Sequence, residues 1–490
     1  MDDSDKGERR SVVLNNYRLI VRIIIYIKAL LTLWRISVLK ITSVVLLLVI
    51  NQSVCAQIEV STLKGDDSEG SLIAAIKNAN AQKTDHDNPV IISFSKDIAG
   101  EIVLSMDLPP IENNISVIGN TENGKPIITI NGTVNPEISG GFKGCISPGF
   151  SLFEVKSGNT ASFENLHLTK SNKSGIIIEG GVVTVKNCML TYNFGIGSVH
   201  GTAGAIQSEN SQLTVIGTYF FYNTGGVGGT DGGVGYGGAG SVNIVGGNAV
   251  FINSSFFENE GGFGGVGVGS VGGAGVIMVR DGNVSIVNCT AAGNFGGGSI
   301  VTGASGGIVM LGGNMSLFES TIAGNMGGAG LGGFDGVDFC SGGIHVLAGK
   351  LSLGGNIIAG NYNGADEASD LEFQANGEVH SLGYNLLGSL KKDFSEGGDV
   401  NGFALKDVVV TTAEGKCKNE IVSGFLPTIA LTTNSPARNK NILFNDINPV
   451  SSYDANAIFF NDAARKYSSL LQADQNGKPR GDKPSIGAVE

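Results

Sequence analysis

Acidic side chains are the groups through which this chain could cleave a sugar polymer. A glycoside hydrolase needs two carboxyl groups roughly 5 to 9 Å apart, whereas a polysaccharide lyase needs carboxylates clustered around a cation and a basic residue that takes the proton. In the repeated region described below, each outward charged residue stands alone in its row: Glu258, Arg280, Asp281 and Glu319. Asp335 and Asp338 lie close together, but in a glycine-rich segment where acids are usually only solvated. These spacings favour binding over catalysis, and catalysis stays the alternative.

No group of residues has the spacing of a metal site. The five histidines are scattered, without an HxxxH or HExxH pattern, and the six cysteines form no closely spaced pairs. The glycine-rich segment "GGTDGGVGYGG" holds one Asp, whereas calcium-binding nonapeptide repeats place an Asp in every repeat. The sequence therefore predicts no metal and no cofactor.

Three aromatic side chains are candidates for a binding surface. Tyr219, Phe221 and Phe257 fall at alternate positions of short strands, on the side expected to face away from the core. Exposed rings on a rigid sheet can stack on sugars or serve as docking points for proteins. The alternative is that neighbouring glycine-rich segments fold back and cover these rings.

An internal repeat supplies the elements that position these side chains. "GNVSIVNCTAAGN" (282–294) recurs in five near-copies, each closed by an asparagine and spaced by 30 to 36 residues. Within each copy, apolar residues alternate with Thr or Ser, which is the period of a half-buried strand. The closing asparagines are expected to hydrogen-bond to one another as a structural ladder along the stack. They are Asn193, Asn223, Asn259, Asn294, Asn325 and Asn361.

Each repeat holds three short strands, because a further apolar piece such as "GGIVML" (306–311) precedes the later copies. A unit of three strands cannot bury its own apolar face, whereas stacked units bury a continuous one. The prediction is an all-β, right-handed parallel β-helix solenoid with three strands per coil. Cys188 and Cys289 occupy the same small, inward position three coils apart, too far for a disulfide.

Glycine is the outlier of the composition, with 76 of 490 residues. Much of it lies in insertions between coils that leave from one corner and are expected to stack as a ridge, at 224–238, 261–273 and 326–343. The net charge of −12 argues against nucleic acid or an anionic membrane as a partner.

Four regions are expected along the chain. Residues 1–56 resemble a targeting segment, with basic residues ahead of the apolar run "ITSVVLLLVI" (41–50). Residues 57–140 hold the N-terminal cap and first coils, including a short amphipathic helix in "GSLIAAIKNANA" (70–81). Residues 141–388 are the β-helix repeats, and residues 389–490 pack over the far end or along one face. Contact with a membrane is expected only through an uncleaved N-terminal segment.

Four stretches of the sequence resemble segments of a known protein family, and they occur in the family's order along the chain. "GGIVMLGGNMSLFESTIAGN" (306–325), "GSLIAAIKNANA" (70–81), "HSLGYNLLG" (380–388) and "ADQNGKPRGDKPSIGAVE" (473–490) resemble the choice-of-anchor Q domain proteins. These bacterial β-helix proteins are related to polymorphic outer-membrane-protein repeats and to pectin lyase-like proteins. Ile73 stands where the family usually has Arg, and we expect neither the family's surface anchor nor an autotransporter barrel in this chain.

The resemblance and the repeat together predict an exported protein on the bacterial surface or outside the cell. Its function is expected to be adhesion or carbohydrate binding without catalysis, with a polysaccharide or another cell's surface as partner. A polysaccharide lyase or glycoside hydrolase of the pectin lyase-like type is the alternative, because that group includes both kinds of enzyme.

Overall fold

The computed structural model describes residues 24–28, 30–32, 34–35, 56–82, 88–133, 149–229, 233–330, 340–390, 398–414, 416–421, 425–438, 473–480 and 485–488. The chain divides into two compact units, Met1–Cys55 and Ala56–Glu490. Of the first unit, the described residues are helical, and the apolar run at 41–50 lies outside them. No helix among the described residues is both long and apolar enough to cross a membrane.

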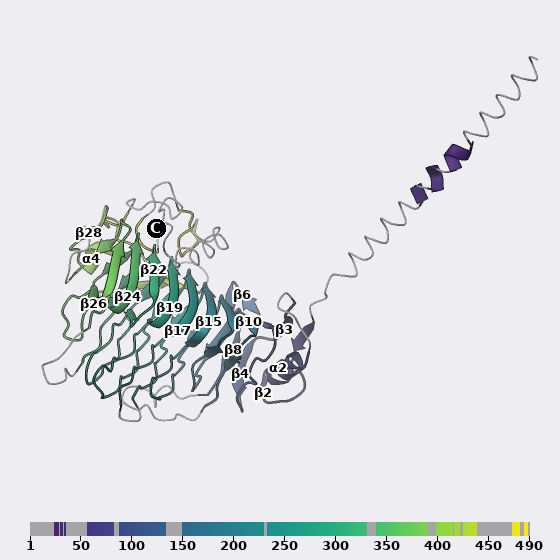
Figure 1. Cartoon of the computed structure of the whole chain (residues 1–490), viewed down its shortest axis with the longest axis horizontal. Coiled ribbons are helices and arrows are strands. Elements are labelled where there is room, and N and C mark those ends of the chain that lie inside the picture. Colours follow the sequence, from purple (N-terminus) through teal and green to yellow (C-terminus); the bar gives the residue numbers. More distant parts are fainter. Residues whose placement is uncertain are drawn as a thin grey trace, which may run out of the picture. The chain divides into compact units, whose positions relative to one another are not determined.

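The second unit is a parallel β-helix (Figure 1). Its strands stack coil upon coil into two large sheets, and every strand pair described within them is parallel. The 14-stranded sheet contains β1 (Gln57–Val60), β3 (Val90–Phe94), β5 (Ile115–Ile118), β9 (Phe153–Val155), β10 (Thr160–Glu164), β12 (Ile176–Glu179), β13 (Val182–Lys186), β15 (Ile206–Ile216), β17 (Val242–Ile252), β19 (Ile277–Val287), β21 (Ile308–Met310), β22 (Asn314–Phe318), β24 (Ile344–Gly354) and β26 (Leu371–Ser381).

The second large sheet has 12 strands and forms the other side of each coil. It contains β2 (Lys64–Gly65), β4 (Gly100–Leu104), β8 (Ile128–Asn131), β11 (Leu166–Thr169), β14 (Met189–Thr191), β16 (Tyr219–Phe221), β18 (Ser255–Phe257), β20 (Thr290–Ala292), β23 (Thr321–Ala323), β25 (Ile357–Ala359), β27 (Leu386–Leu387) and β28 (Val400–Asn401). Two antiparallel pairs lie outside these sheets: β6 (Thr121–Glu122) with β7 (Lys125–Pro126), and β29 (Asn419–Ile421) with β30 (Pro427–Ile429).

The first two predicted strands of a coil lie in one sheet. In β15, β17, β19, β24 and β26 they join into a single strand of 11 residues. The all-β parallel β-helix is therefore confirmed, with the refinement that three strand segments form two sheets. The alternating residues of both sheets fill one continuous apolar core, as in Val284 and Ile286 of β19 and Ala291 of β20.

The closing asparagines form a continuous hydrogen-bonded ladder in the interior. From Asn223 to Asn361, the Oδ1 of each accepts both the backbone N–H and the Nδ2 of the asparagine one coil earlier, at 2.8 to 3.1 Å. All six side chains are fully buried, and the ladder ends on Asp370, whose Oδ1 accepts from Asn361. The ladder satisfies the polar groups at the tightest corner of the coil.

A second ladder runs along the corner before the 12-stranded sheet. The small residues predicted to face inward there accept the backbone N–H of the equivalent residue one coil earlier. Ser254 N–H, for example, donates to the sulfur of Cys289 at 3.4 Å. Cys188 and Cys289 are buried free thiols. Both are small core residues, and the sulfur of Cys289 is also a weak acceptor in this ladder.

Asp370 makes the stability of the ladder's end depend on pH. Burial raises the pKa of its carboxyl to about 6, although N–H groups of Ser389 and Asn361 act in the opposite direction. A raised native pKa gives stability that is complete below about pH 4 and lost as the pH rises through about 6. We expect the free energy of unfolding of the wild type, relative to Asp370→Asn, to fall by about 2 kcal/mol across this window. Urea unfolding of both proteins from pH 4 to 7 measures the difference, and a constant difference would contradict this assignment.

Helix α2 (Leu72–Asn80) covers the N-terminal end of the core, as predicted. Ser71 caps it, because its Oγ accepts the N–H of Ala74 at 3.1 Å. Leu72, Ile76 and Ala79 lie on the predicted face and are completely buried. In Figure 1 the helix lies beside β2, β3 and β4, at one end of the stacked strands.

The glycine-rich segments leave from one corner and pack against one another. Outgoing and returning stretches of successive loops exchange backbone hydrogen bonds of 2.7 to 2.8 Å, as in the series Gly226, Gly238, Gly262 and Gly273. A Cβ at Gly238 would lie 1.8 Å from the carbonyl oxygen of Thr202, so only glycine allows this spacing. The loops cover the outer face of the 14-stranded sheet around Met278, Val309 and His345.

Candidate functional site

The three predicted ring positions face outward but are not exposed as predicted. Phe257 is only 2% exposed, and Tyr219 and Phe221 are half-buried beside it. They pack against apolar residues from the C-terminal part of the chain, including Leu405 and Ile486. The prediction of an exposed platform at these rings is therefore wrong for Phe257.

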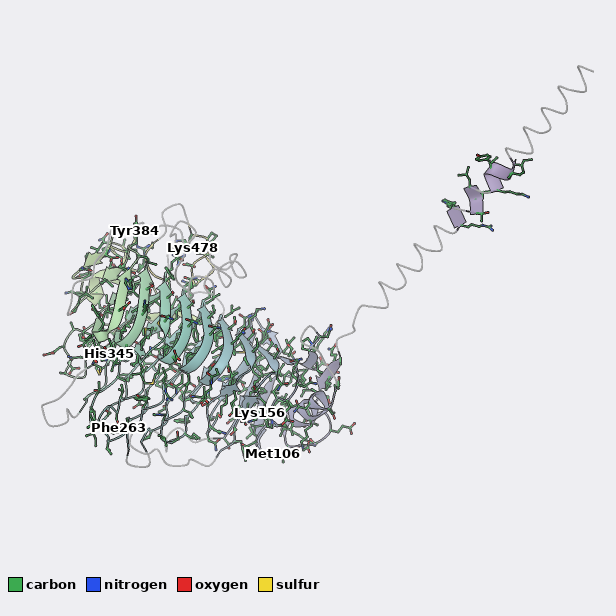
Figure 2. The ribbon with its side chains drawn as sticks, in the orientation of Figure 1. Met106, Lys156, Phe263, His345, Tyr384 and Lys478 are labelled. Atoms are coloured by element: carbon green, nitrogen blue, oxygen red, sulfur yellow. The ribbon has the colours of Figure 1, made fainter. Side chains whose placement is uncertain are left out.

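The alternative, that glycine-rich loops cover the rings, is also wrong. The cover consists of described residues between 403 and 488, here called the C-terminal cover, which lie along the outer face of the 12-stranded sheet. Figure 2 is consistent with this, since Lys478 of the cover and Phe263 of a glycine-rich loop lie at opposite edges of the stack in that view.

Hydrogen bonds fix the C-terminal cover to three successive strands. The Nε2 of Gln475 donates to the Oγ of Ser255 at 2.7 Å, and its Oε1 accepts from the hydroxyl of Thr290. The N–H of Ala488 donates to the Oγ1 of Thr321 at 3.2 Å. Polar residues in the outward row of β18, β20 and β23 are thus docking points within the chain.

The structure changes the interpretation of the predicted charged residues. Glu319 is not an outward residue that stands alone, since it is completely buried with its Oε2 3.5 Å from the Nε of Arg480. Arg280 lies over the ring of Tyr236, with 5.2 Å between its Cζ and the ring centroid. Asp335 and Asp338 lie outside the described residues. In the described ranges, no group of three or more His, Cys, Asp or Glu residues could hold a metal ion.

Two rows of residues flank the asparagine ladder and form a candidate surface separate from the three predicted rings. The residue before each closing asparagine has a left-handed backbone, and this row reads Tyr192, Tyr222, Glu258, Gly293, Gly324 and Gly360. The residue after each asparagine forms a β-bridge with its counterpart in the next coil, and this row reads Phe194, Thr224, Glu260, Phe295, Met326 and Tyr362. We call these two rows the corner strip. At about 4.8 Å per coil, the strip extends roughly 24 Å along the axis.

Tyr192 and Tyr222 form the aromatic end of the corner strip. Their rings stack with 5.3 Å between centroids and 16° between planes. Tyr222 is 43% exposed, and Phe221 contacts both rings edge-on. A left-handed conformation is unfavourable for a tyrosine, so the backbone alone would favour glycine at these two positions.

Glu258 and Glu260 occupy the middle of the corner strip, on either side of Asn259. The repeat pattern did not reveal this pair, because Glu260 falls after the closing asparagine, where a loop was expected. Burial raises the pKa of the Glu258 carboxyl, and Lys416 acts in the opposite direction. The strip therefore carries two carboxyl groups in one coil, two residues apart in the chain.

The other end of the strip lines a pocket of about 540 Å³ between the β-helix and the C-terminal cover. Its apolar wall includes Phe295, Met326 and Tyr362, each between 36% and 39% exposed. Its polar rim includes Lys416 and three acids. The glycines that precede the closing asparagines in these coils leave room for the C-terminal cover. A Cβ at Gly324, for example, would lie 2.9 Å from the sulfur of Cys417.

The sequence matches no family model and no curated protein. Among solved structures, the chain is similar to one described as pectate lyase Pel9A, with 16% sequence identity and a TM-score of 0.41. The similarity covers 89% of this chain and 96% of that chain. The parallel β-helix fold itself follows from the strand pairing described above.

Proposed function

We propose that this chain is an exported, non-catalytic protein that binds carbohydrate, or a carbohydrate-bearing cell surface, along the corner strip. The observation that carries the proposal is the stacked, partly exposed pair Tyr192 and Tyr222 on a rigid coil. Rings fixed in this way lose little conformational entropy on binding and present apolar faces to sugar C–H groups. The strip then continues into an apolar pocket that is large enough for a sugar ring.

The proposed location is the bacterial surface or the medium outside the cell. It rests on the basic and apolar composition of residues 1–56. The order of motifs between residues 70 and 490 supports a relationship to the choice-of-anchor Q domain proteins within the pectin lyase-like group.

Replacing Tyr222 with alanine tests the proposed function. We expect affinity for a glycan identified on an array to fall about 5- to 20-fold, because one stacking face is lost. Tyr222→Phe keeps the ring and should bind within about twofold of the wild type. Val268→Ala is the control, since Val268 is 89% exposed in a glycine-rich loop away from the strip. Unchanged affinity in Tyr222→Ala, with an unchanged melting temperature, would contradict the use of this surface.

A glycoside hydrolase is the second candidate, and the pair Glu258 and Glu260 is the observation that favours it. Hydrolysis requires both an acid with a raised pKa and a second carboxylate. A screen for polysaccharide degradation separates the two functions. Turnover that disappears in both Glu258→Gln and Glu260→Gln would replace the binding-only proposal with the enzymatic one.

A further inference from the structure

Two glutamates occupy left-handed positions in this β-helix: Glu319, where other coils place glycine or asparagine, and Glu258, where three later coils place glycine. Glu319 has φ 46° and Glu258 has φ 54°. The conformation of Glu319 has a structural reason, because its carboxylate lies beside the guanidinium of Arg480 within the fold. Glu258 has the same unfavourable backbone, but across the described ranges no salt bridge or side-chain hydrogen bond to it is found. Its carboxylate is therefore available to a ligand.

The carboxylate of Glu258 points along the strip toward the pocket. A Cβ at Gly293 would lie 2.8 Å from the Oε1 of Glu258, so the carboxylate lies over Gly293, and both residues line the pocket. In the next coil Phe295, which forms a β-bridge with Glu260, lines the same pocket as Glu258. A carboxylate and an aromatic ring therefore line one cavity.

The charge around the pocket favours a cation. Glu258, Asp366 and Glu414 line it together with the single cation Lys416, and Glu260 lies in the same coil as Glu258. A carboxylate can form a charge-assisted hydrogen bond with an ammonium group, and an aromatic face attracts the same group. A polyanionic chain such as a polyuronate would instead meet an excess of negative charge, within a chain of net charge −12.

We propose that the pocket binds a protonated amino-sugar residue of a polysaccharide, with its ammonium on Glu258 and its ring against Phe295 and Tyr362. This inference rests on the proposed function, because it names the class of glycan that the corner strip binds. The tyrosine end of the strip would hold neutral neighbouring sugars of the same chain, and the carboxylates would select for the free amine.

Calorimetric titration of the full chain with glucosamine oligomers and with N-acetylglucosamine oligomers of equal length tests the proposal. Under conditions that protonate the amine, the glucosamine oligomer should bind at least tenfold more tightly. Glu258→Gln should remove most of this preference and leave binding of the acetylated oligomer within twofold. Lys416→Gln should have the opposite effect, a severalfold gain for glucosamine, because it removes the competing cation at the pocket.

Glu122→Gln is the matched control, since Glu122 lies exposed in β6, outside the corner strip. If Glu122→Gln and Glu258→Gln weaken glucosamine binding equally, the attraction is diffuse and the proposal is overturned. Equal affinity for the two oligomers, with no effect of Glu258→Gln, overturns this inference while the carbohydrate-binding function stands. Failure of every glycan to bind, on an array and in titration, overturns both.

Discussion

Replacing Asn294 with alanine is expected to lower the free energy of unfolding by roughly 3 to 6 kcal/mol. Its Oδ1 accepts the N–H and the Nδ2 of Asn259, and its Nδ2 donates to Asn325 and to the carbonyl oxygen of Phe256. Alanine removes all four hydrogen bonds inside a fully buried corner. Each buried polar group left without a partner costs about 1 to 3 kcal/mol. Urea unfolding followed by circular dichroism measures the loss.

The same coil supplies a control for the Asn294 substitution. Asn283 also bonds to its counterparts in both neighbouring coils, since its Nδ2 donates to Asn248 at 3.0 Å and its Oδ1 accepts from Asn314 at 3.1 Å. These amides are partly exposed, so water can replace the lost partners. We expect Asn283→Ala to cost about 1 kcal/mol or less. Similar losses for the two variants would show that the ladder's stability does not arise from burial.

The repeat predicts the coil because its signals are local. Alternation within a strand fixes which residues face inward, and a constant distance from the strand to the closing asparagine fixes the corner. A shift of one residue would expose a row such as Val284 and Ile286, so stacking leaves a single register. The glycine-rich loops follow from the same constraint, because insertions of different lengths leave from equivalent corners.

The candidate site could be predicted only in part, because the cover of the 12-stranded sheet comes from far along the chain. Gln475 lies 220 residues after Ser255, to which it donates, and no periodic pattern reports such a pairing. The strand alternation therefore predicted exposed rings at Tyr219, Phe221 and Phe257. In the structure, apolar residues of the C-terminal cover pack on them.

The sequence nevertheless contains a pattern that could have identified the corner strip. The residue before the closing asparagine is glycine in three coils, which marks a position that requires a left-handed backbone. Tyr192, Tyr222 and Glu258 at the same position are then the departures that need an explanation. The row of glycines has its own reason, since Gly360 leaves room for Leu405 of the C-terminal cover.

Replacing Arg480 with methionine is expected to destabilise the C-terminal cover by about 3 to 5 kcal/mol. Arg480 and Glu319 are both completely buried, and the Nη2 of Arg480 also donates to Asn288 and to the carbonyl oxygen of Gly487, each at 2.9 Å. Removing the cation leaves Glu319 charged and buried without its partner, which is the costly way to break a buried ion pair. The urea midpoint and the exchange rate of the Ala488 amide, which donates to Thr321, measure the effect.

Neutralising both partners distinguishes the free-energy cost of an uncompensated buried charge from the cost of lost packing. In Arg480→Met with Glu319→Gln no charge remains uncompensated, so we expect the double variant to recover at least half of the lost stability. Amides of the asparagine ladder should keep their protection against hydrogen exchange in both variants, because the cover docks on the outside of an already closed coil. If ladder and cover amides lose protection together, the cover is part of the cooperative core. In that case the pocket beside Glu258 would form only when the whole coil stack folds.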